Sequence, residues 1–162
     1  MITTLMMLTG MAQAIKPIAP PKPSTEQMAL YQAMKVRDPV PSCEALIPLS
    51  TTLDTDLIWL VDNVQQPPWV GIRAAQCVVS HHAEVQADTI EAWMTDPSKM
   101  GVAILTLRLL DTLPEATAMR FATAALAGPL SEKATLRLVD SVHPGIKAMV
   151  TAPEPAPTPQ AE

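Results

Sequence analysis

The sequence is poor in aromatic residues, which make up 3% of it, and it contains only five glycines. Strands favour aromatic and β-branched residues, and barrels or sandwiches need many tight turns of the kind that glycine supplies. Both fold classes are therefore disfavoured. Hydrophobic residues nevertheless reach 48%, so the core has to be built from alanine, leucine, valine, isoleucine and methionine. This composition suits closely packed helices and predicts an all-α fold.

Basic residues are also scarce. Lysine and arginine number 11 against 16 aspartates and glutamates, which gives a net charge of −5. Because no basic patch is available to neutralise phosphates, nucleic acid is not expected as a partner. The chain also lacks a glycine-rich phosphate loop, a Gly-x-Ser-x-Gly motif and a His-Glu-x-x-His motif,. We therefore expect neither catalysis nor a cofactor.

The first fourteen residues predict an export signal. Residues 2–11 form a short apolar run, and Ala12, Gln13 and Ala14 form a small-x-small cleavage site,. No basic residue precedes Lys16, which leaves a frayed N-terminal helix as the alternative, unless the true start lies upstream. The run is too short to span a bilayer, and no later one approaches that length. We expect a protein without a membrane span, exported to the periplasm or the cell exterior.

Cysteine occurs only at Cys43 and Cys77. In an exported protein an even pair predicts one disulfide; two buried free thiols are the alternative. The spacing excludes a Cys-x-x-Cys redox motif. A bridge would tie a short N-terminal helix to the helix that begins at Pro68.

Prolines divide the chain into segments. Residues 15–23 and 151–162 each contain four prolines and are expected to be an extended linker and a disordered tail, which leaves residues 24–150 as the helical domain,. Ser24 and Gln27 match a capping box, and Ser98 and Ser131 are further expected N-caps. The expected helices are 25–36, a short one near 43–49, 54–64, 68–82, 84–94, 99–112, 115–127 and one from about 131 to 142, with 146–150 padding the end. The expected core includes Met28, Tyr31, Leu57, Val85, Ile90, Trp93, Ala118, Phe121, Ala122, Ala125, Leu138 and Val139.

The domain also repeats itself. The stretch at 106–112 (Thr-Leu-Arg-Leu-Leu-Asp-Thr) recurs at 135–141 as Thr-Leu-Arg-Leu-Val-Asp-Ser, offset by 29. The turns at 66–68, 96–98 and 127–129 also correspond to one another, but they give a different register, and both registers stay open. Such periods are typical of helical-hairpin arrays, in which each hairpin buries its apolar face only against its neighbours.

The hairpin that contains Pro68 followed by Ile72, Arg73, Ala74 and Ala75 resembles HEAT-type repeats, as does the turn at 96–98 with the residues after it. The resemblance covers about residues 54–142. It implies a short right-handed α-solenoid of about three hairpins behind an N-terminal helical cap, with a function in protein–protein interaction or scaffolding. The alternatives are an accessory or lyase-like enzyme that uses a concave groove, and a purely structural envelope spacer. A deep pocket with convergent polar groups would favour the enzyme.

Second helices of the hairpins carry polar residues in pairs three positions apart, so that both members of a pair share a helix face. We expect a polar strip that faces a protein partner of unknown identity. The alternative is a solvated face or internal Arg–Asp pairs. The six residues are Arg73, Gln76, Arg108, Asp111, Arg137 and Asp140.

Metal binding is not expected at His81, His82 and Glu84. Adjacent histidines on a regular helix diverge by about 100° and cannot chelate one ion together. The expected role is a solvated helix end. The tryptophans, Trp59, Trp69 and Trp93, are expected to pack in or at the edge of the core, with ligand stacking as the alternative.

Overall fold

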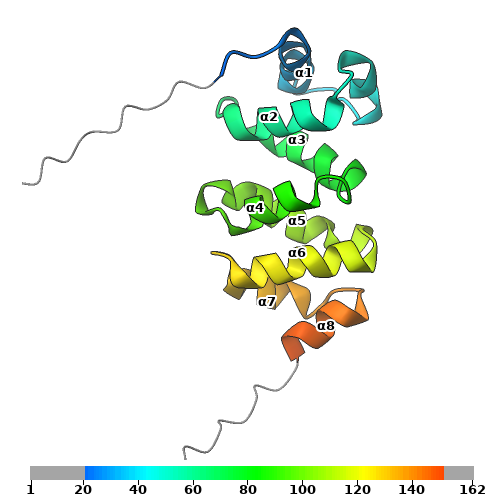
Figure 1. Ribbon diagram of the computed structural model, residues 1–162, viewed down its shortest axis with the longest axis vertical. Coiled ribbons are helices and arrows are strands. Elements are labelled where there is room, and N and C mark those ends of the chain that lie inside the picture. The colour runs from blue at the N-terminus through cyan, green and yellow to red at the C-terminus, as the bar shows by residue number, and fades with distance from the viewer. Residues whose placement is uncertain (1–20, 152–162) are drawn as a thin grey trace, which may run out of the picture.

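The computed structural model describes residues 21–151, and within them the chain is all-α, as the sequence predicts. Eight α-helices and three 3-10 helices follow one another in this range (Figure 1). They are α1 (Thr25–Lys35), η1 (Glu44–Leu49), α2 (Leu53–Asn63), α3 (Pro68–His81), α4 (Ala87–Thr95), η2 (Pro97–Lys99), α5 (Met100–Leu109), η3 (Leu110–Thr112), α6 (Glu115–Ala127), α7 (Ser131–Leu138) and α8 (Pro144–Thr151). The expected signal, most of the expected linker and all but the first residue of the expected tail lie outside the described residues.

The helices pack in successive pairs along the long axis of the molecule (Figure 1). Helices α2 and α3, α4 and α5, and α6 and α7 form the pairs, and the turns within them fall at the proline- and glycine-containing positions predicted from the sequence. Contacts of α3 with α5 and of α4 with α6 join neighbouring pairs. At one end α1 and η1 cover α2 and α3, and at the other α8 packs on α6 and α7. Within the described residues, no helix is both long and apolar enough to cross a membrane.

Local capping chemistry sets the first helix. The Ser24 Oγ accepts a hydrogen bond from the Gln27 N–H at 3.0 Å, and the Gln27 Oε1 accepts one from the Ser24 N–H at 2.9 Å, so the predicted capping box is confirmed,. Helix α3 begins with Pro68, whose missing N–H would have no intrahelical acceptor at that position,. Ala74 and Ala75 are fully buried in this helix, and their small side chains allow the neighbouring helices to approach closely.

Aliphatic and alanine side chains fill the core, with Phe121 the largest of the fully buried ones. The four positions predicted for α6, including Phe121, are all completely buried. Gln86 explains why α4 begins later than predicted: its Nε2 donates to the Asp54 Oδ2 at 2.7 Å and fixes a turn ahead of the helix. Val85 therefore lies in a loop, 78% exposed, and the prediction that it is buried is wrong.

Three further expectations need correction. Val139 is 45% exposed, because α7 already ends at Leu138. Ser98 does not cap a helix; instead the Asp96 side chain accepts from the Ser98 N–H at 2.8 Å and caps η2. Ser131 lies inside α7 as its first residue, and the capping position is taken by the residue before it.

The disulfide is confirmed. Cys43 and Cys77 are joined across a sequence separation of 34, with their Cα atoms 5.5 Å apart. The bond connects the segment before η1 to the middle of α3, and the loop it closes contains the whole of α2. The cap at the N-terminal end is thereby covalently attached to the first helix pair.

Candidate functional site

The six residues predicted as a polar strip lie in two kinds of environment. Gln76, Arg108 and Asp140 are exposed. The other three are partly buried and make hydrogen bonds within the chain. The six therefore do not share one environment along the stack, and whether the exposed members meet a partner stays a prediction.

Arg73 binds the end of the N-terminal helix. Its Nη1 donates to the carbonyl oxygen of Met34 at 2.7 Å and also to that of Val36, at the C-terminus of α1. A cation at this end satisfies carbonyl groups that lack intrahelical partners and interacts favourably with the helix dipole. Lys99, which precedes α5, makes a similar contact with the first helix pair: its Nζ donates to the Val61 carbonyl at 2.8 Å near the end of α2. Arg73 thus connects α3 to the cap.

Asp111 is the centre of a second internal cluster. It accepts hydrogen bonds from the Arg137 Nη2 at 2.8 Å, the Ser141 Oγ at 2.8 Å and the Val142 N–H at 3.1 Å. Partial burial opposes ionisation of the carboxyl group, but these hydrogen bonds and the Arg137 charge outweigh it and lower the pKa of Asp111,. Arg137 and Asp111 therefore form an internal Arg–Asp pair, which is the alternative that the sequence left open for these residues.

The histidine segment lies at a different surface. His81, His82 and Glu84 line a hollow of about 250 Å³ beside the segment that leads into α6. His81 Nε2 is 3.8 Å from the Glu44 carboxylate. Among residues 21–151, no three histidine, cysteine or acidic side chains are grouped so that they could hold a metal ion.

The three tryptophans differ in exposure. Trp93 is buried, and its Nε1 donates to the Asp62 carboxylate at 3.2 Å. Trp69 is partly buried, with the Arg37 guanidinium 4.5 Å from the centre of its ring. The predicted packing role is confirmed for these two. Trp59 is also partly buried against the core, but it forms part of a pocket wall as well.

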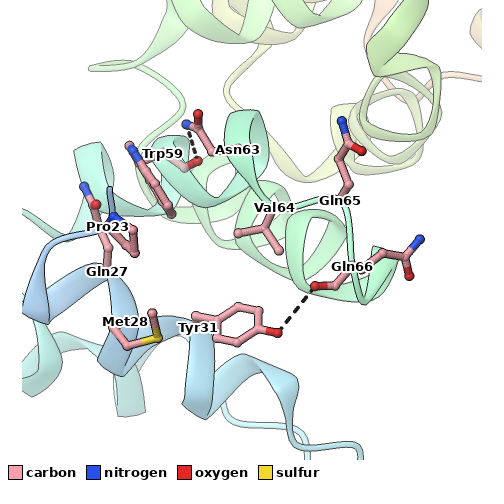
Figure 2. A pocket seen from close by; sticks show the side chains of 9 residues that line it. All are labelled: Pro23, Gln27, Met28, Tyr31, Trp59, Asn63, Val64, Gln65 and Gln66. Carbon is pink, nitrogen blue, oxygen red and sulfur yellow. Dashed lines mark hydrogen bonds between the residues drawn. The ribbon is translucent and has the colours of Figure 1, made fainter. Parts of the chain in front are cut away.

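This pocket lies between α1 and α2 and has a volume of about 230 Å³. Figure 2 shows the residues from α1 on one side and those from α2 and the loop after it on the other. The lining residues are Pro23, Gln27, Met28, Tyr31, Trp59, Asn63, Val64, Gln65 and Gln66. We refer to this surface as the α1–α2 groove.

Hydrogen bonds hold the walls of the α1–α2 groove in place. The Gln27 Nε2 donates to the Asp56 carboxylate at 2.9 Å, and Asp56 is itself buried. The Tyr31 hydroxyl donates to the Gln66 carbonyl at 3.4 Å, and the Asn63 Nδ2 donates to the carbonyl of Trp59 at 2.9 Å (Figure 2). The Tyr31 hydroxyl thus contacts the Gln66 backbone and Trp59 packs partly against the core, while Gln65 and Gln66 stay exposed.

The groove combines aromatic and apolar faces with neutral amides. None of its nine lining side chains is a carboxylate, an imidazole, an ammonium or a thiol. Met28 is 42% exposed in it, although the helical spacing predicted this side chain for the core. The sequence analysis did not identify the groove as a site. The signal that could have been used is the group of three side-chain amides, Asn63, Gln65 and Gln66, between two apolar helices.

Comparisons of the chain with protein-family models, with curated proteins and with solved structures find no match. The groove and its chemistry are therefore the basis on which a function can be assigned.

Proposed function

We propose that the chain is an exported protein-interaction module in which HEAT-like hairpins stack as a short right-handed α-solenoid. The succession of packed helix pairs supports this arrangement, because each pair contacts its neighbours through α3 and α5 or through α4 and α6,. The disulfide supports an oxidising compartment, since such bonds persist outside the reducing cytosol,.

The observation that carries the proposal is the α1–α2 groove. Met28, Tyr31 and Trp59 expose apolar surface to solvent there, beside amide groups that can pair with a peptide backbone. Covering apolar surface is favourable by about 25 cal/mol per Å². A segment of another protein that lies in the groove would gain this contribution and have its backbone hydrogen bonds satisfied by the amides.

Binding accounts for the groove better than catalysis does. Acid–base or nucleophilic chemistry needs a group that can take up a proton or attack, and such groups are most often histidine, a carboxylate, lysine or cysteine. The groove offers Tyr31, whose hydroxyl already donates to the Gln66 carbonyl, and otherwise amides and apolar side chains. It can hold a peptide in place without reacting with it.

The test places a charge in the groove. The variant Met28→Glu introduces a carboxylate at an exposed helical position, and Leu136→Glu, at a position that is 76% exposed on α7, is the matched control. The wild type and both variants are immobilised and used to capture partners from an extract of the cell envelope. Captured proteins are measured by quantitative mass spectrometry, and folding is verified by circular dichroism.

We expect the wild type and Leu136→Glu to capture the same set of envelope proteins and Met28→Glu to lose that set. The melting temperatures of the three immobilised proteins should be equal. Capture that is equal for all three proteins would show that the groove is not the binding surface.

A further inference from the structure

We propose that the α1–α2 groove binds a proline-rich segment in the polyproline II conformation, and that this segment is the leader (residues 16–22) of a second copy of the chain. The inference rests on the proposed function to the extent that the groove is its binding surface. It adds the class of ligand and its source.

The lining of the groove matches what a polyproline II segment needs. Such a segment has no internal hydrogen bonds, so its carbonyl groups are free to accept, and its proline rings pack against aromatic side chains. Tyr31 and Trp59 supply aromatic faces, and Gln65 and Gln66 bring exposed amides to the same groove (Figure 2). Because the lining side chains carry no charged group, the face of the peptide that enters the groove is expected to be uncharged.

The leader has the proline spacing that such a groove can use. Pro17 and Pro20 are three residues apart, and polyproline II has three residues per turn, so in that conformation the two rings lie on one face. The distance from Pro17 to Pro20 along such a helix is roughly 9 Å at about 3.1 Å per residue. In the tail, prolines alternate with other residues from Pro153 to Pro159, which distributes the rings around the helix. The leader is therefore the better ligand of the two.

The path of the chain favours a leader from another copy. Pro23 lines the rim of the groove, whereas Pro21 and Lys22 are exposed, and the blue start of the described chain leads away from α1 (Figure 1). To enter its own groove, the leader would have to reverse direction within residues 21–23, immediately before the N-cap Ser24. Two of those three residues are prolines with fixed φ angles, which restrict such a reversal.

Exchange between two copies avoids the reversal. Each leader ends next to Pro23 at the rim of its own groove, so two copies that face one another can each place their leader in the partner's groove. Both contacts are then the same, as a closed two-fold dimer requires.

The experiment measures association of the chain from Ile15 to Glu162, which retains every described residue, by sedimentation over a range of concentrations. The leader variant combines Pro17→Ala with Pro20→Ala, and the groove variant is Met28→Glu. The control combines Pro155→Ala with Pro157→Ala in the tail.

We expect the wild type to form a dimer that dissociates on dilution. The dissociation constant of the dimer should rise at least about tenfold in the leader variant and in the groove variant, and it should not change in the control. A synthetic peptide of residues 15–23 added in excess is expected to convert the dimer to monomer and to shift the fluorescence of the wild type, a shift absent from the groove variant.

Two results would overturn the inference: a chain that is monomeric at every concentration, even if it binds the peptide, and a dimer that survives in both variants. In either case, loss of captured envelope proteins by Met28→Glu would still support the proposed function. An unchanged capture together with a leader-dependent dimer would contradict the proposed function and leave the dimer in place.

Discussion

Removing the disulfide is the perturbation for which the structure gives the clearest magnitude. Cys43 and Cys77 are 34 positions apart, and in the chain-entropy description a closed loop of this size stabilises the folded state by about 3.8 kcal/mol at 25 °C, because it restricts the unfolded chain. Domains are stable by only about 5–15 kcal/mol. Reduction of the disulfide is therefore expected to remove a large part of the free energy of unfolding and to lower the melting temperature by roughly 10–15 °C.

The assay is chemical denaturation of three samples: the oxidised wild type, the wild type with reductant, and the double variant Cys43→Ser with Cys77→Ser. The reduced wild type and the double variant should lose similar amounts of stability, and reductant should leave the double variant unchanged. The oxidised protein should take up no thiol-alkylating label under denaturing conditions. A loss below about 1 kcal/mol in the double variant would refute the entropic argument, and two labels on the oxidised protein would refute the bond itself.

Three further substitutions test individual contacts, and two others serve as controls. Gly128→Ala would place a Cβ 2.6 Å from a backbone carbonyl oxygen of α4. We therefore expect urea denaturation to show a free energy of unfolding that is lower by about 1–3 kcal/mol. Gly101→Ala, whose Cβ meets only the end of a side chain, should change stability by less than about 1 kcal/mol,. Asp111→Asn should lower the free energy of unfolding by about 1–3 kcal/mol at pH 7. Because folding lowers the pKa of Asp111 from 3.8, the carboxylate stabilises the fold above about pH 4, and this contribution should fade at lower pH. Denaturation curves measured at several pH values test this. Arg73→Met should lower the melting temperature clearly, whereas Gln76→Ala at an exposed position should not,.

Helix boundaries were predictable where a single residue determines them. Ser24 with Gln27 and Pro68 fix helix starts through local chemistry, and the structure agrees with the sequence to within one residue at both. The start of α4 was not predictable in this way. The turn before it contains neither proline nor glycine and is held by the hydrogen bond from Gln86 to Asp54, residues that are 32 positions apart.

The repeat register also needed the structure. The similar stretches offset by 29 place Leu107 opposite Leu136, but the first is 4% exposed and the second 76%. The correspondence of the turns at 96–98 and 127–129 instead matches Leu107 with Leu138, and both of these are buried. Burial in the hairpins therefore follows distance from the turn, and the similarity of the two stretches does not reflect equivalent positions.

The site was the least predictable part. Helical spacing correctly places Arg73 and Gln76 near one another along α3, but it cannot show that the Arg73 guanidinium reaches the end of α1. The groove likewise depends on how α1 lies against α2, which brings Tyr31 to the Gln66 carbonyl across 35 positions. Residues that are distant in the sequence and neither charged nor arranged in a motif leave no local pattern to find.

The covalent link in the first layer also determines how the molecule transmits mechanical tension. A force applied to the two ends of the chain passes from Cys43 directly to Cys77, so that α2 and the first part of α3 lie in a loop that carries no load. On full extension this loop withholds roughly 110–120 Å of contour length. Under tension α1 and the helices from α4 to α8 can therefore extend completely, whereas the segment between Cys43 and Cys77 cannot.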